Sequence, residues 1–277
     1  GMVRERRDPG GEWLGLTRTI TATSVLAELE AEAIRELHAG LVDALSELEE
    51  SPWREYRISL HRAFAASAQD APRALVSLGE WMARKHYYSR ALEMLDHATT
   101  DVQMDPVTAI HCALARGSAL QGLSRTLEAG EALVAARRLA EEQGRGDLRS
   151  RALLQLAEAR RVYGSSTRSA AAAKEALQGL SGPFLDRFRG PVNVLLGCAA
   201  CRQGKLSKGE NLLRKSLLDG DAEQNMRART ALADCLQLSG RVEEAETELS
   251  AVLADLGADD SPVLQVEALY LMSRIHL

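Results

Sequence analysis

The sequence is poor in the residues that build β-sheets, disulfide scaffolds and membrane spans. Of its 277 residues only 4 are cysteine and 4% are aromatic, and 14 valines and 5 isoleucines stand against 43 alanines and 43 leucines. Alanine and leucine have high helix propensity, whereas β-branched and aromatic side chains favour strands. Four cysteines are too few for a disulfide scaffold, and no apolar run approaches the ~20 residues that span a bilayer. The composition predicts an all-α protein.

The charge balance excludes several classes of partner. There are 34 lysines and arginines against 39 aspartates and glutamates, a net charge of −5, and 45% of the residues are hydrophobic. So much apolar material excludes general disorder, and an acidic chain has no overall field that attracts nucleic acid. The charged N-terminus, Met2 to Pro9, has no apolar segment behind it that resembles a signal peptide. We expect a cytoplasmic protein without a nucleic-acid or membrane partner.

A repeat of 36 to 40 residues runs through most of the chain. Each copy has a small anchor residue, a second small residue twelve positions later and an apolar residue four further on. The five sets are Gly79, Ala91, Leu95 and Ala98; Gly117, Ala129, Leu133 and Ala136; Ala157, Ser169, Ala173 and Ala176; Gly197, Gly209, Leu213 and Ser216; and Ala233, Ala245, Leu249 and Val252. A sixth copy begins at Leu271 and Met272. Periods of this length are typical of stacked helix hairpins, in which small residues allow close helix approach.

Glycine and proline residues mark the expected ends of the helices. Gly164, Gly204 and Gly240 each follow their anchor by seven residues, where a left-handed residue would end the first helix of a hairpin. Prolines are predicted to lie between helix pairs rather than inside a helix, since they lack an N–H. These prolines are Pro72, Pro106, Pro183, Pro191 and Pro262.

The pattern resembles the tetratricopeptide repeat family, whose unit of about 34 residues has small residues at its eighth and twentieth positions. Residues 237–246 (QLSGRVEEAE) and 86–92 (HYYSRAL) are close to the family's turn and second-helix start. The longer units are similar to those of bacterial regulatory superhelices within the family. The resemblance implies a right-handed α-α superhelix of about five hairpins, with an N-terminal helix pair and a C-terminal single helix.

The expected organisation has three parts. Residues 1–22 are predicted to be a poorly ordered leader, and residues 23–70 an N-terminal helix pair that acts as a cap or degenerate repeat. Residues 71–277 are predicted to form the array. Its units are expected near 72–106, 107–146, 147–183, 187–221 and 222–258, with a partial unit at 262–277.

No motif predicts catalysis. Cys198 and Cys201 have the spacing of a zinc or redox pair, but Cys112 and Cys235 lie in other units and no histidine pair accompanies them. We interpret the pair as small residues of a helix that face the concave surface. No pairing of nucleophile and base, phosphate-binding loop or dinucleotide motif is recognisable. We therefore expect neither a metal nor a cofactor, and an enzyme is a minor alternative.

The family resemblance assigns a groove to the first helices of the units. The assigned residues are Arg73, Val76, Glu80 and Arg84; His111, Leu114, Ser118 and Gln121; Arg151, Leu154, Glu158 and Arg161; Val194, Cys198, Cys201 and Arg202; and Arg227, Thr230, Asp234 and Gln237. Six of them are arginines and three are acids, which favours an acidic or C-terminal carboxylate ligand. In the alternative interpretation this is a solvated face, on which Glu80 neutralises Arg84 and Glu158 neutralises Arg161.

Two functions are consistent with these features. The first is a noncatalytic interaction module that binds a protein, as a peptide or a partner helix, in a concave, arginine-rich groove. The alternative is a regulatory or sensor array of a larger bacterial signalling or transcription regulator, since the sequence stops in a first helix without its mate. A homodimer through the partial repeat, with apolar residues such as Leu269 and Leu271, is also open.

Overall fold

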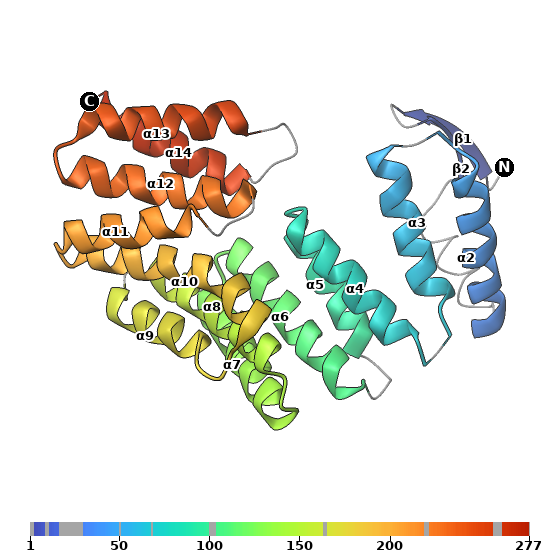
Figure 1. The fold of residues 1–277 in the computed structure, drawn as a ribbon. Helices are drawn as coiled ribbons and strands as arrows, with labels where there is room; N and C mark the ends of the chain where they lie inside the picture. The colour runs from blue at the N-terminus through green and yellow to red at the C-terminus, as the bar shows by residue number, and fades with distance from the viewer. Residues whose placement is uncertain are drawn as a thin grey trace. The chain divides into compact units, whose positions relative to one another are not determined.

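The computed structural model describes residues 3–8, 11–16, 30–49, 51–67, 69–99, 104–162, 165–218, 222–256 and 262–276. Its elements are a β-hairpin and, among the described residues, thirteen helices (Figure 1). They are β1 (Val3–Asp8), β2 (Gly11–Leu16), α2 (Ala31–Ser46), α3 (Pro52–Ala65), α4 (Ala71–Arg84), α5 (Tyr88–Thr99), α6 (Pro106–Gly122), α7 (Thr126–Glu142), α8 (Gly146–Val162), α9 (Ser166–Ala176), α10 (Gly182–Arg202), α11 (Leu206–Ser216), α12 (Ala222–Leu238), α13 (Val242–Asp255) and α14 (Pro262–Ile275).

The N-terminal hairpin is the one element type that the sequence analysis did not predict. β1 and β2 pair antiparallel, with Val3 opposite Leu16 and Asp8 opposite Gly11. Both strands fall inside residues 1–22, for which no regular element was expected. The search for a helical repeat does not detect strand pairing, because alternation over six residues has a different period. The other described elements are helices, which confirms the predicted all-α class for the body of the chain.

Four turns end the first helices of the repeats with a left-handed residue, two of them at the predicted Gly204 and Gly240. The backbone φ angle is positive at His86 (65°), Ser124 (59°), Gly204 (75°) and Gly240 (78°), in each case seven residues after the anchor. The N–H of the next residue donates to the carbonyl five positions earlier, at 2.8 to 2.9 Å in all four turns. This is a Schellman cap, which satisfies the last carbonyls of the helix. Gly164, the fifth predicted turn residue, lies outside the described residues.

The small anchor residues are required by close helix packing. A Cβ atom added at Gly79 would lie 2.8 Å from Leu95 Cδ2, and one added at Gly197 would lie 2.6 Å from Leu213 Cγ. All twenty residues of the five aligned sets are buried. In the third unit the polar Ser169 fits because its hydroxyl donates to the Ala157 carbonyl at 2.8 Å. The repeat alignment therefore identified the contact positions correctly.

The prediction that no proline lies inside a helix is wrong for Pro191. Pro72 and Pro183 lie in the first turns of α4 and α10, where the missing N–H costs nothing, but Pro191 is in the interior of α10. An interior proline leaves one carbonyl without its helical donor, at a cost of ~3 kcal/mol. The burial of Phe188 and Val192 on either side of Pro191 offsets that cost. The fourth unit therefore begins with one helix of 21 residues.

The chain divides into two compact units, residues 1–119 and 120–277. In the first unit α2 packs on α3, α3 on α4 and α4 on α5. Tyr56 of α3 stacks on Trp81 of α4, with 6.2 Å between the ring centroids. The helix pair therefore contacts the first repeat directly. No helix among the described residues has the length and apolar character to cross a bilayer.

In the second unit the helices form two layers. Each helix from α7 to α14 packs on the next one in the chain, and α8, α10, α12 and α14 also contact one another in succession. We call these four helices the inner layer. Among the described residues, α9, α11 and α13 show no comparable contacts with one another. Because the inner helices contact one another and the outer helices show no comparable contacts in the described ranges, the stack of helices curves toward the inner layer. The candidate site lies on this concave side.

Candidate functional site

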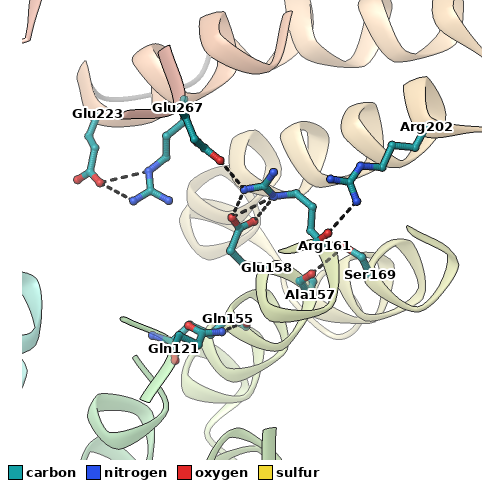
Figure 2. Close-up of polar contacts among 10 residues, drawn as sticks. Gln121, Gln155, Ala157, Glu158, Arg161, Ser169, Arg202, Glu223 and Glu267 are labelled. Carbon is teal, nitrogen blue, oxygen red and sulfur yellow. Dashed lines mark hydrogen bonds and ion pairs between the residues drawn. The ribbon is translucent and has the colours of Figure 1, made fainter. Parts of the chain in front are cut away.

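Arg161, near the end of α8, bridges two carboxylates of the inner layer (Figure 2). Its Nε atom lies 3.0 Å from both carboxylate oxygens of Glu158, and its Nη2 atom lies 2.6 Å from Glu158 Oε1. Nη2 also lies 3.3 Å from Oε1 of Glu267, which belongs to α14. Burial lowers the pKa of Arg161, but the hydrogen bonds to Glu158 raise it above its usual value, so the side chain is charged.

The Arg161–Glu267 contact indicates how strongly the inner layer is curved. The two residues lie 106 positions apart, on the first and last helices of the layer. Neighbouring helix axes are ~8 to 10 Å apart, so three steps across a flat layer would separate α8 from α14 by roughly 24 to 30 Å. Two side chains do not span that distance. The inner layer therefore curls into a concave surface, which we call the inner face.

Further ion pairs neutralise the arginines of this face. Arg227 binds Glu223, one helical turn earlier on α12, at 2.8 Å. Asp234 of α12 binds Arg274 of α14 at 3.2 Å. Arg202 makes no ion pair among the described residues, but its Nη1 atom donates to the Arg161 carbonyl at 2.8 Å (Figure 2). The second unit therefore has fewer uncompensated arginines than the predicted residue set implied.

The sequence analysis missed three residues of these pairs. Glu223 could have been found, because it precedes Arg227 by four residues on a predicted helix. Glu267 and Arg274 carried no such signal. They lie in the partial repeat, and their partners are on helices that only the curvature brings near.

The predicted groove residues fall in both units. Seven belong to residues 1–119: Arg73, Val76, Glu80, Arg84, His111, Leu114 and Ser118. There Glu80 pairs with His111 Nδ1 at 3.0 Å. The ion pairs of the described residues do not include Glu80 with Arg84, which the solvated-face interpretation supposed. The pairing of Glu158 with Arg161, which the same interpretation predicted, is present. Arg73 and Arg84 are exposed, and Ser118 is half-buried.

Four predicted groove residues are buried in the helix core. They are Val76, Leu114, Cys201 and Thr230, and each is at most 6% exposed. They are removed from the candidate site, because a partner cannot reach them. The remaining residues of the second unit are half-buried or exposed: Gln121, Arg151, Leu154, Glu158, Arg161, Val194, Cys198, Arg202, Arg227, Asp234 and Gln237. Gln121 Nε2 donates to the Gln155 carbonyl at 2.9 Å (Figure 2).

Cys198 and Cys201 are unsuited to nucleophilic chemistry. Burial raises the pKa of the Cys198 thiol to about 12, although Arg161 acts in the opposite direction. Burial and a hydrogen bond with Cys235 also raise the pKa of Cys201. Thiols of this kind stay protonated at neutral pH, and the thiolate is the reactive form. In the described ranges no cluster of three or more histidine, cysteine or acidic side chains is arranged to hold a metal ion.

Comparison with known proteins gives the class of fold. No family model and no curated protein matches this sequence. NprR in complex with its cognate peptide NprX is similar in structure, with a TM-score of 0.62 and 12% identity over 88% of this chain and 72% of that chain. A Rap protein complexed with competence and sporulation factor gives a TM-score of 0.59 and 16% identity over 93% and 69%.

A third structure with a similar fold belongs to a tetratricopeptide repeat protein. The thermophilic tetratricopeptide repeat protein TTC0263 of Thermus thermophilus gives a TM-score of 0.52 and 20% identity over 73% of this chain and all of that chain. At sequence identities this low, the similarity to these three structures shows a shared fold and nothing more. The chain has the helical-repeat fold of tetratricopeptide-type proteins, which confirms the resemblance found in the sequence.

Proposed function

We propose that the chain is a noncatalytic binding module whose inner face holds an extended peptide or a helix of a partner protein. The Arg161–Glu267 ion pair is the observation that supports this most directly. It requires a concave layer of helices, and a concave, rigid surface is the usual setting for peptide recognition by helical repeats.

The side chains of the inner face suit a peptide. Leu154 of α8 and Val194 of α10 are half-buried, so part of each remains open to a partner. Arg202 is exposed and makes no ion pair among the described residues, and Arg227 is exposed beside its partner Glu223, so both guanidinium groups are within reach of a partner. The NprR structure contains its cognate peptide, which is consistent with this use of the fold. For the present chain a peptide partner is our proposal.

The test is selection of binders from a displayed library of random peptides, followed by titration of the selected peptides. We expect the double variant Arg202→Glu/Arg227→Glu to lose about tenfold or more in affinity, because both residues are exposed on the inner layer. The matched control is Arg138→Glu/Arg214→Glu, which changes the same charge on α7 and α11. Failure to select any binder, or equal losses in the two double variants, would contradict the proposal.

A second candidate function is a regulatory array, in which a bound ligand alters the curvature and so an attached domain. The Arg161–Glu267 ion pair between α8 and α14 favours the regulatory function. A ligand that separates these two residues removes an interaction that constrains the curvature of the inner layer. Small-angle scattering with and without a selected peptide tests this function. An unchanged radius of gyration at saturation would count against it.

A further inference from the structure

Two carboxylates of the chain share one guanidinium on the inner face. Glu158, three residues before Arg161 on α8, receives three short hydrogen bonds from it. Glu267 receives only one, at 3.3 Å, from an Nη2 atom that already donates to Glu158 at 2.6 Å. The Glu267 side chain is also 45% exposed. Glu267 is therefore the more weakly held carboxylate and the one that water or a ligand reaches.

Arg161 has donor capacity that Glu267 does not use. A guanidinium carries five N–H donors, and the end formed by its two Nη atoms binds a carboxylate with two parallel hydrogen bonds. Within the described ranges no hydrogen bond involves Arg161 Nη1, so Glu267 does not form this paired arrangement. Arg202 donates to the Arg161 backbone carbonyl, and Figure 2 shows the Arg161 guanidinium between Glu158 and Glu267. A free carboxylate could thus bind better than Glu267 does.

Glu267 stands in an exposed apolar stripe of α14. Val263, Val266, Glu267 and Tyr270 are spaced i, i+3, i+4 and i+7, which places them on one helix face. Val263 is 56% exposed, Val266 65% and Tyr270 63%. The Arg274–Asp234 ion pair lies next to this stripe, since Arg274 follows Tyr270 by one turn. The surroundings of Glu267 thus favour apolar groups next to an anionic one.

We propose that Arg161 recognises a carboxylate of the bound peptide and that Glu267 occupies this position until the ligand displaces it. The inference rests on the proposed peptide-binding function and names its ligand: a peptide with a carboxylate, from a side chain or its C-terminus, flanked by apolar side chains. The carboxylate takes the Nη1 and Nη2 donors of Arg161, while the apolar side chains cover Val266 and Tyr270. Release of Glu267 frees α14 from α8.

The experiment compares peptides selected from the random library with versions in which each carboxylate, including the C-terminal one, is replaced by the amide. We expect replacement of one carboxylate to weaken binding to the full chain about tenfold or more, since charge-assisted hydrogen bonds are lost. The same replacement should have no effect on the Arg161→Gln variant. Glu267→Gln should bind the original peptide several-fold more tightly than the unchanged chain, because its internal competitor is weaker.

Glu244→Gln on α13 is the matched control, because it removes the same charge from an exposed carboxylate that pairs with Arg241 instead of Arg161 and lies outside the inner layer. It should leave the affinity within about twofold. Selected peptides that bind equally well as amides, or a Glu267→Gln variant that behaves like Glu244→Gln, would overturn the inference and leave the binding function intact. The absence of any binder would instead overturn the binding function.

A second copy of the chain on the α14 stripe would also overturn the inference. Analytical ultracentrifugation would detect this outcome as a dimer of the unchanged chain, and the Val266→Lys variant would then sediment as a monomer. Thermal unfolding of each variant by circular dichroism verifies that the fold is retained, and the amide comparison on the unchanged chain needs no variant.

Discussion

At the scale of single residues, the repeat depends on positions where no side chain fits. A Cβ atom added to Gly209 would lie 2.3 Å from Cys201 Sγ and 3.1 Å from the Gly197 carbonyl oxygen. By contrast, a Cβ atom at Gly130 of α7 would meet no atom within 4 Å. The two glycines have the same intrinsic helix propensity, so only packing distinguishes them.

We therefore predict opposite effects of the same substitution at these two glycines. Gly209→Ala should lower the free energy of unfolding by about 1 to 3 kcal/mol, because the packed helices must move apart. Gly130→Ala should raise it by up to about 1 kcal/mol, because alanine is the better helix former. Urea unfolding followed by circular dichroism measures both. A loss at Gly130 as large as that at Gly209 would show that packing is not the cause.

Two histidines of the first unit also act at the residue scale. His38 Nδ1 of α2 lies 2.8 Å from His61 Nδ1 of α3, and Phe64 stacks on His38. Burial lowers the pKa of both imidazoles, and the charges of His38 and Arg57 lower that of His61 further. The folded state therefore binds protons less readily than the unfolded chain, whose histidines titrate near pH 6.5.

We predict that the stability of the first unit falls as the pH drops below about 6.5, where the unfolded histidines begin to protonate. Above that pH both states are neutral and the contribution is fully present. Urea unfolding at pH 7 and pH 5, followed by tryptophan fluorescence, measures the loss. His61→Gln should reduce the difference between the two pH values, whereas His276→Gln, directly after α14 in the second unit, should not. An unchanged difference in His61→Gln would refute the role of the pair.

At the scale of elements, the four repeat turns within the described residues each contain one left-handed residue. Glycine takes this conformation freely at Gly204 and Gly240, but His86 and Ser124 adopt it with a side chain. Their backbones form the same cap, with hydrogen bonds to the carbonyls three and five residues before. The cap, and not the residue type, is therefore the shared feature of the turns.

We predict that exchange of residue types at this turn position changes stability in a fixed direction. Ser124→Gly should raise the free energy of unfolding by up to about 1 kcal/mol, because the left-handed strain it relieves exceeds the entropy that glycine adds to the unfolded chain. Gly204→Ala should lower it by about 1 kcal/mol for the converse reason. Midpoints of urea unfolding at constant slope measure both. If Ser124→Gly is destabilising, the hydroxyl and not the φ angle governs this turn.

At the scale of the whole molecule, each of the two units has its own buried core. Leu95 packs in the first unit and Leu249 in the second, and both are fully buried. All three tryptophans, Trp13, Trp53 and Trp81, belong to residues 1–119. Tryptophan fluorescence therefore reports on the first unit alone, whereas circular dichroism reports on the helices of both.

We predict that the two units unfold separately. Leu249→Ala should destabilise the second unit by about 2 to 5 kcal/mol, which shifts part of the circular dichroism transition and leaves the fluorescence transition in place. Leu95→Ala is the reciprocal control and should shift the fluorescence transition. Equal shifts of both signals in both variants would show a single cooperative unit.

The fold was predictable because its signals are local. The anchors, the residue twelve positions later and the turn at offset seven lie within one hairpin, so a single alignment found them. The structure buries the anchors and their partners and gives a positive φ to the four described turn residues. The exceptions have physical reasons. The rule that proline is excluded from helix interiors placed Pro191 outside a helix, but the burial of neighbouring side chains overrides that rule. The strands β1 and β2 have a residue alternation that the search for a helical repeat does not test.

The candidate site was predictable only in part. Family positions led to Arg161, Glu158 and Arg202, but they also selected Leu114 and Thr230, which face neighbouring helices and are buried. A sequence position identifies the helix face approximately, whereas exposure depends on the rotation of each helix against its neighbours.

The sequence by itself determined the repeating hairpins, because helix propensity, small residues and turn residues act within about 40 residues of one another. Only the tertiary structure decided which charges meet. The ion pair between Arg161 and Glu267 joins residues 106 positions apart, and no local pattern encodes it. It forms because small packing angles add up over successive helices, and their sum, the curvature of the inner layer, is a property of the whole stack.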